Sequence, residues 1–127
     1  MLVTPAYAAI LALLFVFLSV LTINKRRSAG AAIGDGGQVQ LQRAIRVHAN
    51  FAEYVPFALL LIYFLEISSR MDWLIHVLCL VLISGRLLHA YGVSQARENL
   101  RYRVTGMAMT FTVIVTAAVV ILISSLL

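Results

Sequence analysis

A row of polar side chains with helical spacing is the part of this 127-residue sequence most able to do chemistry. Because an α-helix repeats about every 3.6 residues, these side chains share one narrow face if their segment is helical. The row consists of Gln42, Arg43, Arg46, Asn50, Glu53 and Tyr54. His48 lies off this face. Guanidinium, amide and carboxylate groups gathered in this way could bind an anionic ligand.

The row begins an apolar stretch, and this limits where its charges can point. A charged side chain at membrane depth costs at least about 2.5–3.5 kcal/mol, so it normally faces a bundle interior or a wet cavity. Arg46 and Glu53 offset each other only partly, because Asn50 and two helical turns separate them. Two interpretations stay open: polar contacts that hold helices together, or an anionic-ligand site open to the cytoplasm. Pro56 is tolerated in a membrane helix and predicts a kink just beyond the polar row.

A second pair of polar residues, Arg86 and His89, is spaced to share a helix face. Arg86 is the most deeply placed cation of the sequence, and we expect Glu53 or a ligand carboxylate as its partner. His89 either belongs to this site or makes one structural hydrogen bond. The face continues through Arg97 and Arg101 if the helix persists past Gly92, although this glycine could also end it.

Other kinds of site are not indicated by the sequence. His48, His76 and His89 show no close pairing, and Cys79 lies in an apolar run, so we predict no metal site. A nucleophile elbow, a phosphate-binding loop and a dinucleotide fingerprint are also missing. If the protein is an enzyme, its chemistry should come from a bound cosubstrate.

The elements that position these residues are four apolar segments. The chain is 62% hydrophobic and 12% charged, too apolar for a small water-soluble domain. The segments are long enough to cross a bilayer as helices, and strand-like alternation is missing, which argues against a β-barrel. We therefore predict an all-α integral membrane protein, a single membrane domain over residues 1–127. Its four-helix bundle has spans at about 5–23, 41–66, 73–91 and 104–127.

Basic residues predict the orientation of these spans. They cluster between spans one and two and between spans three and four, which identifies both connections as cytoplasmic. This side carries Lys25, Arg26, Arg27, Arg43, Arg46, Arg97, Arg101 and Arg103, against Arg70 on the other. Both termini are then non-cytoplasmic. The same distribution argues against a nucleic-acid-binding domain. Residues 1–4 carry no basic side chain, which favours a retained first span over a signal peptide.

The first connection contains a glycine cluster at residues 34–37 that predicts a turn. A glycine-rich nest that binds an anion is the alternative.

The polar row also resembles a known signature. The pattern Arg46-x-His48-x-Asn50-x-x-Glu53-Tyr54-x-Pro56 is similar to the second-helix motif of the MAPEG family, the membrane-associated proteins in eicosanoid and glutathione metabolism. Arg86 with His89, followed by a basic segment ending in Arg101 and Arg103, is similar to the family's third helix and the loop after it. The glycine cluster resembles the short bacterial branch, whose members are like microsomal glutathione transferases.

The resemblance implies a homotrimer that binds glutathione between neighbouring subunits, without a metal. By this resemblance Arg46, Asn50, Glu53 and Tyr54 hold the peptide part of glutathione, and His48 occupies a position where some relatives have glutamine. Arg86 and His89 lie on the facing wall, and Arg101 or Arg103 supports the thiolate. Val93 stands where eicosanoid-making relatives place a tyrosine, which argues against a specific eicosanoid product.

The implied function is that of a glutathione transferase or peroxidase in a bacterial inner membrane, with its glutathione site facing the cytoplasm. The thiolate would attack hydrophobic electrophiles or lipid hydroperoxides that arrive from the bilayer. A non-catalytic membrane protein, whose polar face serves assembly or anionic-lipid binding, is the alternative. A small transporter or channel is less favoured, because the sequence has no internal repeat.

Overall fold

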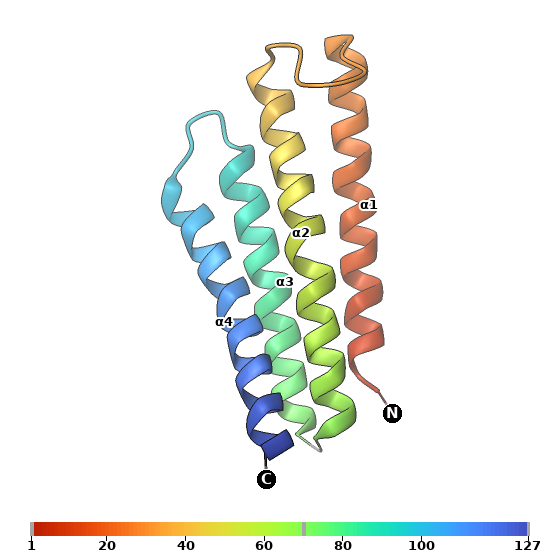
Figure 1. Ribbon diagram of the computed structural model, residues 1–127. Coiled ribbons are helices and arrows are strands. Elements are labelled where there is room, and N and C mark those ends of the chain that lie inside the picture. Colours follow the sequence, from red (N-terminus) through yellow and green to blue (C-terminus); the bar gives the residue numbers. More distant parts are fainter. Residues whose placement is uncertain (1, 70, 127) are drawn as a thin grey trace.

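The computed structural model describes residues 2–69 and 71–126 as four long helices packed side by side (Figure 1). They are α1 (Thr4–Ala29), α2 (Val39–Ser68), α3 (Asp72–Ser94) and α4 (Leu100–Leu126). All four are long and apolar enough to cross a membrane. The prediction of an all-α four-helix bundle is therefore confirmed. Arg70, on which part of the orientation argument rests, lies outside the described residues.

The chain runs up and down, so that both ends lie at the same end of the bundle (Figure 1). The α1–α2 and α3–α4 connections lie together at the opposite end, which we call the loop end. This arrangement agrees with the prediction that the two basic connections share one side of the membrane. Which side that is remains a prediction.

Each helix is longer than the apolar segment that predicted it. The first was expected to end near residue 23 but continues to Ala29, where Gly30 closes it with a left-handed φ of 62°. The third continues through Gly92 to Ser94, and the fourth begins at Leu100 rather than near residue 104. A hydropathy pattern reports only the part of a helix inside the hydrocarbon, whereas backbone hydrogen bonding continues into the polar interface.

Other local predictions can be checked in the same way. The second helix continues through Pro56. The glycine cluster does form a turn, with positive φ at Gly34, Gly36 and Gly37, and the Gly37 N–H donates to Asp35 Oδ1 at 2.9 Å.

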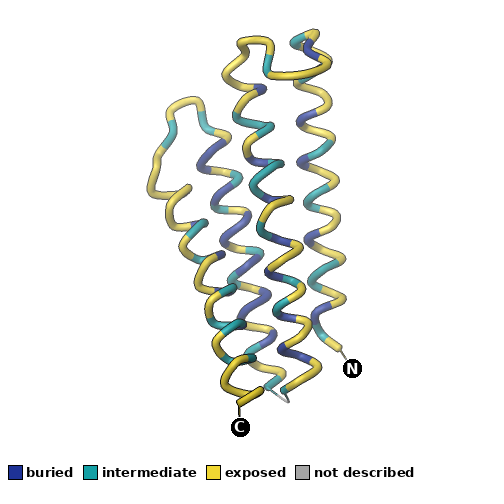
Figure 2. The backbone as a smooth tube through the Cα atoms, viewed as in Figure 1, coloured by how far each residue is buried: buried dark blue, intermediate teal, exposed yellow. Residues whose placement is uncertain are grey.

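Buried residues line the faces that the helices turn toward one another, while the outer faces are exposed (Figure 2). The core includes Ala58, Ile62, Ile75 and Leu82, each fully buried. Large apolar side chains cover much of the outside of the bundle, among them Leu13, Phe17, Trp73 and Leu122. A surface of this kind is suited to lipid rather than water, because lipid tails are as apolar as leucine.

Two glycines let α3 and α4 approach very closely near the loop end. A Cβ added at Gly106 would lie 2.5 Å from the carbonyl oxygen of Gly85 and 2.7 Å from the backbone nitrogen of His89. Small residues at a membrane-helix contact allow the backbones themselves to pack. This contact therefore fixes the distance between His89 and the first turns of α4.

At the other end of the bundle, Glu66 joins α2 to the start of α1. Its buried carboxylate accepts hydrogen bonds from the Val3 and Thr4 backbone N–H groups, the latter at 2.9 Å. Amides in the first turn of a helix have no partner within the helix. Glu66 thus supplies those partners from a helix that lies far along the chain.

Candidate functional site

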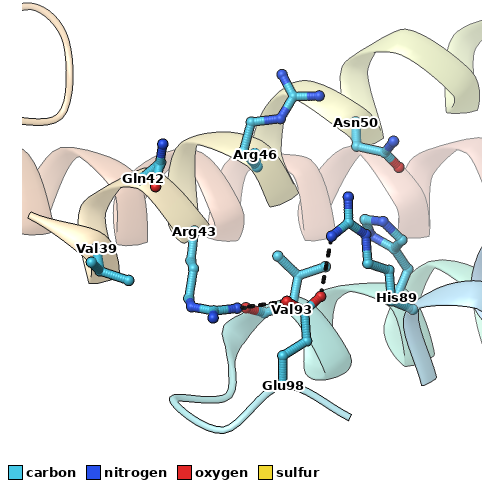
Figure 3. A pocket seen from close by; sticks show the side chains of 9 residues that line it. Val39, Gln42, Arg43, Arg46, Asn50, His89, Val93 and Glu98 are labelled. Carbon is cyan, nitrogen blue, oxygen red and sulfur yellow. Dashed lines mark hydrogen bonds and ion pairs between the residues drawn. The ribbon is translucent and has the colours of Figure 1, made fainter. Parts of the chain in front are cut away.

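A polar cavity of about 210 Å³ opens at the loop end, between α2, the end of α3 and the start of α4 (Figure 3). Three arginines and one carboxylate converge on it. The lining residues are Val39, Gln42, Arg43, Arg46, Asn50, His89, Val93, Glu98 and Arg103. This volume is below the roughly 300–1,000 Å³ of typical ligand pockets.

Arg86 lies behind the inner wall of this cavity and is only 1% exposed. Its Nη2 donates to Asn50 Oδ1 at 2.6 Å and lies 3.2 Å from His89 Nδ1. Its Nη1 lies 3.4 Å from Thr110 Oγ1, whose hydroxyl in turn donates to the Gly106 carbonyl at 2.9 Å. Arg86 therefore connects the three helices that enclose the inner end of the cavity.

The expectation that Arg86 pairs with Glu53 is wrong. Within residues 2–69 and 71–126, the hydrogen-bond partners of Arg86 are neutral groups on α2, α3 and α4. Glu53 is exposed on the surface of α2. Asn50 lies nearer to Arg86, on the face that α2 turns toward α3.

The mouth of the cavity is bridged by Glu98, in the connection between α3 and α4. Its carboxylate accepts from Arg43 Nη1 at 3.1 Å and from Arg103 Nη1 at 3.2 Å. Arg43 Nη1 also donates to the Val93 carbonyl at 3.1 Å. The hydrogen bond from Arg43, together with that from Arg103, holds the pKa of Glu98 below its usual value of 4.5. The bridge thus ties α2 to α4 across the end of α3.

The sequence prediction did not include Glu98, because it considered only the basic residues of this connection. One signal could have found it. Glu98 is the single acidic residue in the segment from residue 92 to residue 103, where arginines surround it. A lone carboxylate among several cations is a natural ion-pair partner for them.

The structure brings four of the predicted site residues to the cavity: Arg46, Asn50, His89 and Arg103. It also separates the two arginines that the sequence left as alternatives near the thiol. Arg103 lines the cavity, whereas Arg101 is exposed elsewhere, and its backbone N–H donates to Asn99 Oδ1 at 3.1 Å.

Three other predicted residues do not line this cavity. His48 faces α1, where its Nε2 lies 2.9 Å from Ser19 Oγ and its ring stacks on Phe15 at 4.7 Å. Tyr54 packs edge-on against Phe111 of α4, with ring centroids 5.5 Å apart. Glu53 is exposed, as is Arg46 at the edge of the cavity. Neither Arg46 nor Glu53 has a side-chain hydrogen bond or ion pair with any residue that the structure describes.

No group of three or more His, Cys, Asp or Glu residues in residues 2–69 and 71–126 could hold an ion. Cys79 is buried in the apolar core, away from the cavity.

Comparison with known proteins identifies the family of this chain. The sequence model of the MAPEG family matches residues 4–123. The inner membrane protein YecN of Escherichia coli K12 is 38% identical over 109 residues, which cover 86% of this chain and 82% of the relative. The YecN protein of Escherichia coli O6:H1 matches to the same extent. The chain is therefore an integral membrane protein that belongs to the MAPEG family.

Proposed function

We propose that this protein is a glutathione-dependent membrane enzyme that activates the thiol of glutathione for attack on hydrophobic electrophiles or lipid hydroperoxides. The observation that carries the proposal is the convergence of Arg43, Arg46 and Arg103 with Asn50 and His89 on one cavity at the loop end. The MAPEG family includes glutathione transferases. Glutathione carries two carboxylates and a thiol, so it needs a site rich in hydrogen-bond donors and positive charge.

Arg46 and Asn50 are suited to hold the peptide part of glutathione. Arg46 is exposed at the edge of the cavity and has no partner among the described residues, so its guanidinium is free to pair with a ligand carboxylate. A bidentate guanidinium–carboxylate pair gives orientation as well as affinity. Positioning of this kind accounts for much of the rate that an enzyme can supply without a covalent nucleophile.

Arg103 is the residue that we assign to the thiol. A free cysteine-type thiol has a pKa of about 8.5, and the thiolate is the nucleophile. A guanidinium beside it favours the ionised form through opposite charge. The proton leaves to water, because the cavity opens at the loop end. Arg103 meets the geometric requirement that Arg101 does not, since it lines the cavity.

A second subunit completes the site in this proposal. Arg46 and Glu53 are exposed on a membrane-spanning helix of the isolated chain. Exposure of a charge to lipid costs at least about 2.5–3.5 kcal/mol, so a protein surface or an aqueous cleft has to cover them. A homotrimer with its glutathione sites between neighbours supplies such cover, and it extends a cavity that is small in one chain. Glu53 then acts toward the neighbouring subunit, while Tyr54 keeps its contact with Phe111 of α4 and is only half-buried beside it.

The orientation follows from the basic connections. We place the loop end in the cytoplasm, where the positive-inside rule puts it. Glutathione then enters from water, and the hydrophobic substrate enters from the bilayer. A bacterial inner membrane is the expected location, because YecN is named an inner membrane protein.

Thiolate formation is the direct test. Glutathione is titrated into the detergent-purified protein, and binding is followed by calorimetry while the thiolate is followed by ultraviolet difference absorbance against pH. We expect binding, a thiolate signal below the normal thiol pKa, and turnover with a generic aromatic electrophile. Arg103→Ala should raise the thiol pKa and lower turnover while leaving binding nearly intact.

Arg101→Ala is the matched control, since it removes a neighbouring arginine that does not line the cavity. Equal loss in both variants would contradict the role of Arg103. Binding without any thiolate signal or turnover would point instead to a non-catalytic protein. Absence of binding would leave the polar groups as assembly contacts or an anionic-lipid site.

A further inference from the structure

Arg86 does not line the cavity, but it determines whether polar groups on the cavity's inner wall donate or accept hydrogen bonds. Arg86 is 1% exposed, and its Nε is buried without a partner among the described residues. A guanidinium has N–H donors and no acceptor. Any side chain bonded to Arg86 must therefore accept from it.

This requirement determines the amide orientation of Asn50 and the tautomer of His89. An amide has one accepting oxygen and a donating NH₂, and Arg86 Nη2 takes the oxygen of Asn50 at 2.6 Å. A neutral imidazole has one donor and one acceptor nitrogen, and Arg86 Nη2 lies 3.2 Å from Nδ1 of His89. Nδ1 must then be the acceptor, which leaves the proton on Nε2. A proton on both ring nitrogens would set two N–H groups against each other.

The remaining polar atoms of both residues are donors, and both residues line the cavity. In the part of the chain that the structure describes, Asn50 Nδ2 and His89 Nε2 have no hydrogen-bond partner. The buried polar side-chain atoms without a partner there are Thr4 Oγ1, Arg43 Nε and Arg86 Nε. The two donors are therefore accessible to a ligand rather than sealed in the core.

We infer that Arg86 is a positioning residue that turns Asn50 and His89 into obligate donors, so that the inner wall accepts carboxylate or thiolate groups and rejects groups that donate. This inference rests on the proposed function for the identity of the ligand. The polarity of the wall itself does not depend on that identity. Arg86 acts through its two neighbours and does not touch the ligand.

The tautomer of His89 tests the inference without any ligand. The chain has three histidines, His48, His76 and His89, so nitrogen-15 spectra of histidine-labelled protein can be assigned by single substitutions. We expect His89 to be neutral and protonated on Nε2 at neutral pH. A proton on Nδ1, or a doubly protonated ring, would overturn the inference. In folded Arg86→Gln, whose amide can donate or accept, we expect His89 to become a mixture of tautomers. An unchanged spectrum would contradict the inference that Arg86 sets the tautomer of His89.

A pair of isosteric substitutions tests the consequence for binding and avoids loss of the fold. Asn50→Asp keeps an acceptor for Arg86 and replaces the NH₂ donor by a second oxygen. Gln42→Glu places the same new charge on the same cavity, but no hydrogen bond joins Gln42 to Arg86. If only charge mattered, Gln42→Glu would weaken glutathione binding more, because Arg86 neutralises the new carboxylate at position 50.

If the inner wall must donate hydrogen bonds, the order of the two losses in affinity is reversed. We expect Asn50→Asp to weaken glutathione binding by about tenfold or more, as for loss of a hydrogen bond to an ionised acceptor. Its thermal stability should equal or exceed that of the wild type, and Gln42→Glu should lose less affinity. A smaller loss in Asn50→Asp than in Gln42→Glu would overturn the inference. If the wild-type protein binds no glutathione, the proposed function fails, and the His89 spectrum still decides the question of wall polarity.

Discussion

Replacing Gly106 by alanine should disturb both the α3–α4 contact and the chemistry of the cavity. The added Cβ would lie 2.5 Å from the Gly85 carbonyl oxygen and 2.8 Å from the Cβ of His89. Close carbon–oxygen contacts between helices are about 3.3–3.6 Å. The start of α4 must therefore retreat from α3 by about 0.8 Å or more to reach that range.

The cost has two parts. Overpacking of a close contact destabilises a fold by about 1–3 kcal/mol. The same retreat moves Arg103, one turn earlier on α4, away from His89 on α3. A displacement of about 1 Å can cost roughly a hundredfold in rate, so turnover should fall more steeply than stability.

The assay compares unfolding in mild detergent with turnover at a temperature where both proteins remain folded. Ala108→Val is the control, because Ala108 lies on the same helix but is exposed. We expect a change of less than about 0.5 kcal/mol for this control. A Gly106→Ala protein with wild-type stability and wild-type turnover would refute the claim that backbone contact sets the cavity geometry.

Four further expectations follow from the site and the bundle. Arg46→Ala should weaken glutathione binding by roughly tenfold to a hundredfold in calorimetry, because it removes a charged hydrogen bond worth about 1.5–3 kcal/mol; unchanged affinity would exclude Arg46 from the site. Arg43 and Arg103 lower the pKa of Glu98 below its usual value of 4.5. The two ion pairs therefore stabilise the fold fully above pH 4.5, and this stabilisation is lost as the pH falls through the lowered pKa. Thermal denaturation should therefore show the wild type losing more stability than Glu98→Gln below about pH 4.5, and parallel curves would contradict this. Reporter fusions after residues 30 and 99 should report the cytoplasm and a C-terminal fusion the opposite side; a cytoplasmic C-terminus would reverse the orientation. Native mass spectrometry from mild detergent should show a trimer, and a stable monomer that still binds glutathione would remove the intersubunit site.

The sequence predicted the fold class because lipid leaves few alternatives. Every backbone polar group inside a bilayer needs a partner within its own segment, so four long apolar segments imply four helices. The helix ends could not be predicted in the same way. Lys25 and Arg26 are as compatible with a helical extension as with a loop, and the αL conformation of Gly30 decides where α1 ends.

The candidate site was predicted in part. Helical periodicity on α2 identified Arg46 and Asn50 correctly as neighbours of one face, and both line the cavity. Periodicity gives no information on distances between helices, and for this reason Glu53, one of the two partners expected for Arg86, was predicted wrongly. The choice between Arg101 and Arg103 likewise depends on where α4 begins, which a hydropathy pattern cannot locate.

The contact between Glu66 and the start of α1 has a consequence for biogenesis. The Val3 and Thr4 amides receive their carboxylate only after more than sixty further residues have been synthesised. During translation the first helix can enter the bilayer, but its leading end stays unanchored until the far end of the second helix has left the ribosome. The hydrogen bonds between Glu66 and the start of α1 can therefore form only after both helices of the hairpin have been made. The vertical register of α1 against α2 thus depends on a contact that can exist only once both helices are complete.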